Sequence, residues 1–272
     1  MSNQTTFERS LEGNAPWLFL SPHLDDAVLS CGALIEAQTR QREITVATLF
    51  TEAMPAPHTR AARSFMRQCS VMDAGSLFQA RQAEDRAVLK AMGVQSVHLG
   101  AVDALFRGRR RPAKLRRGVW DALLPELTHR YPTFRFDIAL GRIARGDREL
   151  IRHLQGSVAE LLHQTNSELL FCPAGVGKHV DHMITRGVGE EYPEKLVMYS
   201  DFPYDLASEP DEDHLSEMGL LRFTWGSGLE TKSRRIKEYI TQVDALFPGG
   251  AIPLKPETYF VPGPGNAVYE SI

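Results

Sequence analysis

Two short clusters of histidine and aspartate residues are the part of this sequence that could carry chemistry. The first, Ser21–Asp26 (SPHLDD), places the imidazole of His23 beside the carboxylates of Asp25 and Asp26, and the second is HVDH at positions 179–182. Histidine and carboxylate ligands suit Zn2+, whose catalytic sites have three protein ligands and an open position for water. Fe2+ and Mn2+ accept the same ligands. Together the clusters predict a divalent metal site, with zinc as the first candidate.

Each cluster also has an ordinary structural explanation when it is taken alone. An aspartate before a helix often caps that helix, and paired histidines near a helix start are often surface residues. Adjacent side chains in an extended turn point in different directions, so Asp26 can bind a metal while Asp25 faces the water. His179 and His182 share one face of a helical turn, and Asp181 is close enough in sequence to orient an imidazole. The joint occurrence of the two clusters favours the metal site.

A buried strand is expected ahead of each cluster, at Trp17–Leu20 and Glu168–Cys172. Short apolar runs alternate with longer amphipathic stretches along the chain, which is typical of a layered α/β domain. Because functional loops of a parallel sheet gather at the carboxyl ends of its strands, the sheet would position both clusters. No linker marks a boundary, so a single domain over residues 1–272 is expected.

The same patterns predict the remaining elements. The further expected strands are Ile44–Phe50, Ser96–Leu99, Phe134–Leu140, Leu196–Ser200 and Leu221–Trp225. The expected helices are Ala27–Gln38, Leu77–Met92, Val119–Arg130, Arg148–Gln164, one that begins near His179, and Ser233–Leu246. Residues 51–76 are expected to be irregular, residues 103–117 to form a loop with a basic tract, and residues 248–265 to form a Pro/Gly-rich surface segment.

The composition excludes some classes of function. The chain of 272 residues is 43% hydrophobic and 24% charged, which is typical of a soluble protein. A net charge of -3 predicts no affinity for nucleic acid or acidic membranes. No signal peptide and no run of roughly 18 apolar residues is visible, so no membrane span and a cytoplasmic location are expected. The three cysteines lack CxxC spacing and are expected to be reduced thiols. A homo-oligomer is compatible with all of these features.

The two clusters also carry a resemblance to a known family. SPHLDDAVLSCG resembles the PHPDDE motif of the PIG-L (LmbE-like) deacetylases, and HVDH resembles their second motif, HPDH. The stretch Arg81–Glu84 resembles a further family segment, and the likeness runs from Pro16 to about Tyr199. The chain departs from the motifs by having Leu24, Ala27 and Val180 in place of proline, an acidic residue and proline. None of these three positions carries the chemistry in the family.

The resemblance implies a Rossmann-like α/β fold, with a mostly parallel sheet flanked by helices. It also implies removal of acetyl groups from N-acetylglucosamine units in glycolipids, thiol cofactors and antibiotics. By position, His23, Asp26 and His182 would bind the metal. Asp25 would be the general base that takes a proton from the water. His179, with Asp181 beside it, would stabilise the oxyanion or protonate the leaving amine.

Five further polar residues are expected to contact the substrate: Arg81, Asp103, Lys178, Asp201 and Tyr204. The basic tract at residues 106–117 is expected to be a solvated loop, with closure over an anionic substrate as the alternative. The expected function is a zinc-dependent N-deacetylase that acts on a small N-acetylated sugar derivative. An amidase of a thiol conjugate and a non-catalytic binding protein are the alternatives.

Overall fold

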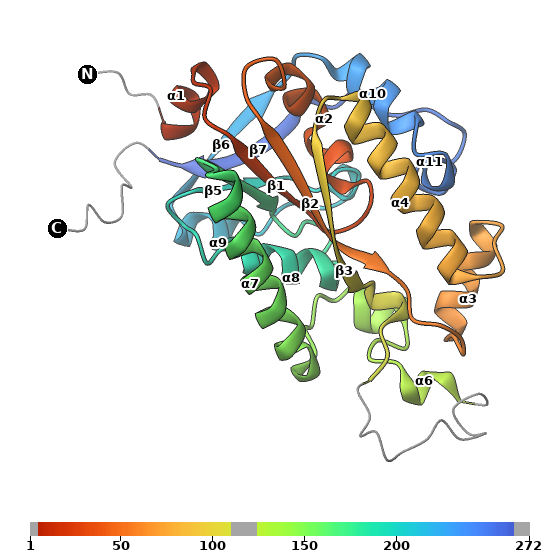
Figure 1. Ribbon diagram of the computed structural model, residues 1–272. Helices are drawn as coiled ribbons and strands as arrows, with labels where there is room; N and C mark the ends of the chain where they lie inside the picture. The colour runs from red at the N-terminus through yellow and green to blue at the C-terminus, as the bar shows by residue number, and fades with distance from the viewer. Residues whose placement is uncertain (1–4, 110–123, 264–272) are drawn as a thin grey trace.

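A seven-stranded mixed sheet forms the centre of the molecule (Figure 1). The computed structural model describes residues 5–109 and 124–263. The strands are β1 (Trp17–Ser21), β2 (Ile44–Glu52), β3 (Gln95–Val102), β4 (Leu169–Pro173), β5 (Leu196–Tyr199), β6 (Leu220–Trp225) and β7 (Glu257–Pro262). Their order across the sheet is β3-β2-β1-β4-β5-β7-β6. The first five are parallel, and β7 pairs antiparallel with both β5 and β6.

Helices cover both faces of this sheet. They are α1 (Thr6–Glu12), α2 (Asp26–Gln38), α3 (Arg60–Gln68), α4 (Ala74–Ala91), α6 (Pro125–Thr128), α7 (Arg148–Thr165), α8 (Val180–Gly189), α9 (Glu212–Glu217), α10 (Leu229–Lys237) and α11 (Ile240–Leu246). Short 3-10 turns lie at Ala104–Phe106, Arg145–Asp147 and Tyr204–Leu206. No helix in the described part of the chain is both long and apolar enough to cross a lipid bilayer.

The side chains of β1 divide between two cores, because successive residues of a strand point to opposite faces of the sheet. Leu18 and Leu20 pack with α7 and α8 on one face. Trp17 and Phe19 pack with α1, α2 and α4 on the other. Every residue of β1, β4 and β5 is buried, as expected for parallel strands that are covered on both sides. The single α/β domain with a mostly parallel sheet, predicted from the sequence, is confirmed.

The strand order reverses direction at β1. From β1 the chain passes outward to β2 and β3, and it then returns to place β4 on the other side of β1. Such a reversal leaves a crevice at the carboxyl ends of the two central strands, and ligands of open α/β sheets bind there. The two histidine–aspartate clusters directly follow β1 and β4, so both lie at this position.

Two segments that were expected to lack regular structure contain an element each. Helix α3 lies within residues 51–76, where Thr59 caps it by accepting a hydrogen bond from the N–H of Ala62 at 3.1 Å. Strand β7 lies within residues 248–265, and its Tyr259 is fully buried between β5 and β6. Prolines and glycines lie near both elements, so the local composition does not indicate regular structure there.

Two other predictions about elements were wrong. Phe134–Leu140 is not a strand, because Phe134–Ile138 forms a single π-helical turn in which only Ile138 is buried. The expected helix Ser233–Leu246 is two helices, α10 and α11, because the backbone leaves the helical region at Tyr239 (φ -83°, ψ 67°). Of the expected helix Val119–Arg130, residues 119–123 lie outside the described residues, and α6 is one turn of it. The basic residues 110–117 also lie outside them.

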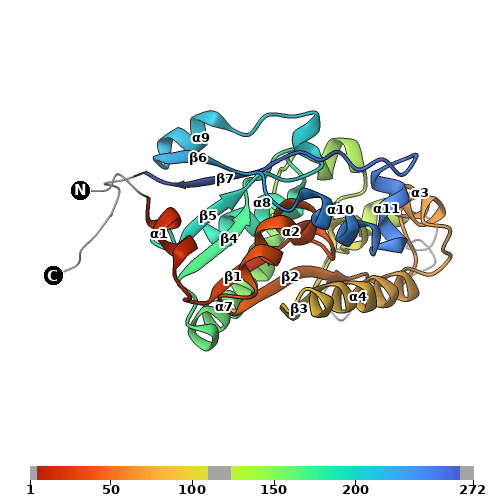
Figure 2. The same ribbon diagram turned by 90° about the horizontal axis from the view of Figure 1, so that it is seen from above.

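A buried carboxylate joins the antiparallel part of the sheet to α2. Glu257 of β7 accepts hydrogen bonds from the N–H groups of Ala33 and Leu34, at 2.8 and 3.0 Å, and from the hydroxyl of Tyr259 at 2.8 Å. Its carboxylate also lies 3.2 Å from the ammonium nitrogen of Lys232 on α10, which is equally buried. Figure 2 shows α10 alongside α2, and this ion pair fixes both helices to β7.

We expect Glu257→Ala to lower the free energy of unfolding by about 3–5 kcal/mol, because it leaves the Lys232 ammonium buried without a counter-charge. Equilibrium urea denaturation measures the change. The matched control is Arg222→Ala, which removes an exposed ion pair with Glu212 and is expected to change stability by less than about 1 kcal/mol. Equal effects of the two substitutions would contradict a structural role for the buried pair.

Candidate metal centre and active site

A cavity of about 540 Å³ opens where β1 and β4 end. Its polar wall includes His23, Asp25, Asp26, Arg81, Asp103 and His179. Its apolar wall includes Leu29, Phe65, Leu105, Phe134, Tyr204 and Leu246. The histidine and both aspartates of the first cluster therefore line the same cavity as His179 of the second cluster.

One carboxylate oxygen lies between two imidazoles in the way that a shared metal ion requires. The Oδ2 atom of Asp26 is 3.1 Å from Nδ1 of His23 and 3.3 Å from Nε2 of His182. Within the described structure, Nε2 of His182 is buried and has no hydrogen-bond partner. Ligand atoms of a tetrahedral zinc site lie about 3.3–3.4 Å apart, because each is about 2.0–2.1 Å from the ion. Each of the two distances to Asp26 is close to this separation, so Asp26 is a candidate ligand beside both imidazoles.

The other nitrogen of each imidazole faces a carboxylate. Nδ1 of His182 lies 2.6 Å from Oδ1 of Asp201. Nε2 of His23 lies 3.4 Å from Oδ2 of Asp181 and 3.5 Å from Oδ2 of Asp103. Metal-binding histidines usually donate their second ring N–H to such a group, which fixes the ring and the tautomer. The arrangement thus directs Nδ1 of His23 and Nε2 of His182 towards Asp26.

The carboxylates around these rings favour a positive charge at the centre. Burial alone would lower the pKa of His182, but Asp26 and Asp201 outweigh it and raise that pKa to about 9. Burial would also lower the pKa of His23, but hydrogen bonds to Asp181 and Asp26 raise it well above its ordinary value. Burial would raise the pKa of Asp26, but the two imidazoles hold it well below its usual range. A site with this field attracts a cation, whether a proton or a metal ion.

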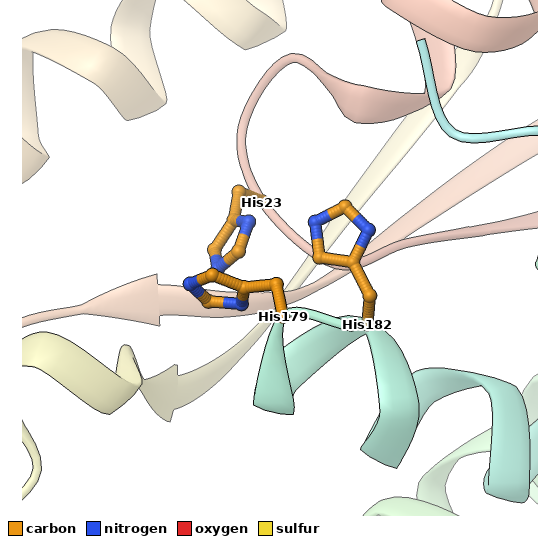
Figure 3. A group of neighbouring side chains, drawn as sticks. All are labelled: His23, His179 and His182. Carbon is orange, nitrogen blue, oxygen red and sulfur yellow. The ribbon is translucent and has the colours of Figure 1, made fainter. Parts of the chain in front are cut away.

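His179 is the third imidazole of the group (Figure 3). Its ring centre is 4.9 Å from that of His23 and 5.3 Å from that of His182, and the three rings could also share an ion. Asp26, whose Oδ2 atom is within 3.3 Å of a nitrogen of both other rings, is the alternative third ligand. Nδ1 of His179 accepts the backbone N–H of Asp181 at 3.3 Å, so Nε2 carries the proton. Burial, followed by the charge of His23, holds the pKa of His179 well below its ordinary value. His179 is therefore a neutral hydrogen-bond donor in the cavity wall.

Asp25 precedes α2 but does not cap it. Its side chain makes no capping hydrogen bond. Ser21 serves the helix start instead, because its hydroxyl accepts the N–H of Ala27 at 3.0 Å and donates to the carbonyl of His23 at 2.7 Å. Burial, and then the charge of Asp26, raise the pKa of Asp25 to about 7. A carboxyl group with this pKa can both accept and return a proton at neutral pH.

Asp181 was predicted to orient an imidazole, and the imidazole that its carboxylate faces is that of His23. This carboxylate accepts hydrogen bonds from the N–H of Ala104, at 2.8 Å, and from the guanidinium of Arg107. Only its backbone N–H contacts His179, while its Oδ2 faces His23. The carboxylate of Asp181 therefore supports His23, a candidate metal ligand, rather than His179.

The expected substrate-contacting residues divide into two groups. Three of them line the cavity: Arg81, Asp103 and Tyr204. Asp201 is 1% exposed, and its carboxylate also accepts the N–H of Val176 at 2.9 Å, so it supports His182 and is not part of the wall. Lys178 is exposed and lies outside the lining of the cavity.

Two helices that the sequence did not place at the site form part of its wall. α3 contributes Phe65 and Gln68, and α11 contributes Gln242 and Leu246. Nε2 of Gln242 donates to the carbonyl of Leu24 at 2.8 Å, across 218 residues of sequence. A capping threonine before α3 was a local signal for that helix. No local pattern marks Gln242, because its partner is so distant in the chain.

Comparison with known proteins relates the chain to a family of deacetylases. Residues 18–192 match the sequence model of the PIG-L family, described as GlcNAc-PI de-N-acetylase. The chain is 28% identical over 209 residues to 2'-N-acetylparomamine deacetylase of Streptomyces fradiae, a match that covers 74% of this chain and 61% of that protein. The chain thus spans less than two thirds of this curated relative.

Solved structures of other deacetylases share the fold. A teicoplanin deacetylase in its zinc-inhibited form superposes with a TM-score of 0.67 at 20% identity, over 90% of this chain and 97% of that one. An antimicrobial pseudoaglycone deacetylase gives a TM-score of 0.65 at 22% identity, over 90% and 96% of the two chains. The Rossmann-like α/β fold implied by the motifs is therefore confirmed.

We expect Asp201→Asn to weaken zinc binding about 10–100-fold, because the substitution removes the charge that holds His182. Competition with a chromophoric chelator measures the affinity. Asp205→Asn is the matched control, since the Asp205 carboxylate contacts Ser200 and Lys255 and no imidazole. Unchanged affinity in a folded Asp201→Asn protein would rule out His182 as a ligand.

Proposed function

The chain belongs to the PIG-L family, and from this premise we propose that it is a zinc-dependent N-deacetylase of an amino-sugar-containing metabolite. The curated relative is named for 2'-N-acetylparomamine, and a structural neighbour is named for teicoplanin. These names support a substrate of the antibiotic-precursor type, within a family range that also includes glycolipids and thiol cofactors. The reaction would release acetate and a free amine.

The observation that carries the proposal is that the carboxyl group of Asp25, which makes no capping hydrogen bond, lies beside the candidate metal ligands. Asp26 and two imidazoles form the centre, and the Asp25 carboxyl beside them makes no capping bond and lines the cavity. A protein that only binds its ligand does not need a proton acceptor next to a metal. A bound zinc ion supplies Lewis acidity, which polarises an amide carbonyl and makes a water molecule more acidic.

The residues of this chain supply the proton transfers. Asp25 is placed to take a proton from the attacking water and to pass it to the nitrogen of the leaving amine. His179 offers Nε2–H to the carbonyl oxygen as that oxygen gains negative charge, and the donor is already held in place by the backbone N–H of Asp181. Because His179 is neutral, it stabilises the oxyanion, and protonation of the amine is assigned to Asp25.

The cavity wall suits a sugar ring. Phe65, Phe134 and Tyr204 offer aromatic faces, while Arg81 and Asp103 offer a donor and an acceptor for hydroxyl groups. Pockets that combine apolar walls with a few placed polar groups are typical of small-molecule sites. An amidase of a thiol conjugate would use the same centre, and substrate identity separates it from the deacetylase.

The proposal is tested by incubating metal-loaded protein with a panel of N-acetylated aminoglycoside intermediates, nucleotide sugars and simple amino sugars, and measuring released acetate. We expect acetate from at least one aminoglycoside-type substrate, loss of activity with a chelator, and recovery when zinc is returned. Absence of acetate across the panel would favour the thiol-conjugate amidase. Purified protein without stoichiometric metal would instead favour a binding protein.

We expect Asp25→Asn to lower kcat by ~10²–10⁴-fold while the metal content stays unchanged, because only the proton acceptor is lost. Acetate release and elemental analysis measure the two properties. Asp244→Asn, an exposed aspartate on α11, is the control and should keep the normal rate. A near-normal kcat in Asp25→Asn would remove Asp25 from the mechanism.

A further inference from the structure

A buried series of alternating charges leads from His23 at the candidate metal centre to Asp147 at the start of α7. Arg107 is 5% exposed, and its guanidinium donates to the carboxylate of Asp181 and, at 3.0 Å, to Oδ2 of Asp147. Its Nε also donates to the carbonyl of Val102 at 2.9 Å. Asp181 in turn faces Nε2 of His23. The order Asp147, Arg107, Asp181, His23 therefore ends at a predicted metal ligand.

The outer end of this series is held firmly. Asp147 is fully buried and accepts hydrogen bonds from the hydroxyl of Tyr131, at 2.5 Å, and from the guanidinium of Arg130. The guanidinium carbon of Arg107 lies 4.8 Å from the ring centre of Phe50 and 5.6 Å from that of Tyr131. Arg107 thus has aromatic rings around it and carboxylates at both ends, which leaves its position little freedom.

Stability alone does not explain such a buried ionic group. Well-packed apolar side chains of similar volume commonly stabilise a fold as well as a buried charge cluster does. The cluster does have a local effect at the centre, because it immobilises the carboxylate of Asp181. Arg107 donates to Oδ1 of this carboxylate, while Oδ2 faces Nε2 of His23. The contact with Arg107 therefore holds the carboxylate in the orientation that faces His23.

We infer that Arg107 and Asp147 are positioning residues for the metal centre. They fix the carboxylate of Asp181, this carboxylate holds the proton of His23 on Nε2, and Nδ1 is then free to bind the ion. Supporting groups of this kind commonly set metal affinity. The inference rests on the proposed metal centre but not on the identity of the substrate. Arg107 is then paired with Asp147 and Asp181, so it is not one of the basic residues that would bind an anionic substrate.

The chain contains a matched control for this role. Arg42 is buried to a similar extent as Arg107, at 6% exposed. It packs on an aromatic ring as well, with its guanidinium carbon 3.8 Å from the ring centre of Trp17. Its guanidinium donates to the backbone carbonyls of Ser10 and Gly13, both at 2.7 Å. These contacts lie at the amino-terminal end of β1, whereas the metal centre follows its carboxyl end.

We expect Arg107→Met and Arg42→Met both to lower the midpoint of thermal unfolding. Only Arg107→Met should weaken zinc binding, by about 10–100-fold in chelator competition. It should also change the visible absorption of the cobalt-substituted protein, which reports ligand geometry. Arg107→Lys should restore part of the affinity, because an ammonium group still neutralises Asp181. Equal zinc affinities in folded Arg107→Met and Arg42→Met would overturn the inference.

Asp147→Asn tests the same series if Arg107→Met does not fold. It keeps hydrogen-bond acceptors for Tyr131 and Arg107 but removes the charge, and we expect a smaller loss of zinc affinity in the same direction. Unchanged affinity and an unchanged cobalt spectrum in this variant would also overturn the inference. If the wild-type protein binds no metal, the proposed centre fails together with it. If the wild type binds zinc and the variants bind it equally well, only the positioning role fails.

Discussion

The parallel pairing of β1 with β4 is the constraint on which the site depends. Trp17, Leu18 and Phe19 pair with Leu169, Leu170 and Phe171, so the two strands end side by side. The loop after β1 and the start of α2 carry His23, Asp25 and Asp26, and the segment that leads from β4 into α8 carries His179 and His182. The Oδ2 atom of Asp26 thereby lies 3.3 Å from Nε2 of His182, although the two residues are far apart in the sequence. Without this pairing neither cluster is a complete site.

Much of the fold could be predicted from the sequence where a local pattern was sufficient. Strands β1, β4 and β5 are almost wholly apolar, and the alternation of apolar runs with amphipathic stretches predicted the layered α/β class. Prediction was poor where local composition conflicted with tertiary packing. Strand β7 sits among prolines and glycines and is buried only because β5 and β6 flank it. Phe134 and Phe136 alternate with polar residues as in a strand, but both are exposed, at 49% and 70%.

The candidate site shows the same division. The two motifs predicted candidate ligands and a candidate proton acceptor, because such predictions depend on residue type and on position after a strand. Spacing could not show which atom of a side chain faces which neighbour. Asp181 was expected to orient an imidazole, and only the structure shows that its carboxylate faces His23 and Arg107. The partner of a side chain is decided by packing between distant segments, which a local pattern does not contain.

The hydrogen bond between Gln242 and Leu24 attaches a helix from the carboxyl-terminal part of the chain to the cavity, whose histidines and aspartates come from earlier parts. The family match ends at residue 192, after both histidine–aspartate clusters. Gln242 and Leu246 belong to α11, well beyond that point, yet they complete the cavity wall. Mutation of α11 can therefore alter which molecules are accepted while the reacting groups stay intact. An evolving lineage could exchange this carboxyl-terminal helix to change which molecules are bound and keep its histidine–aspartate site.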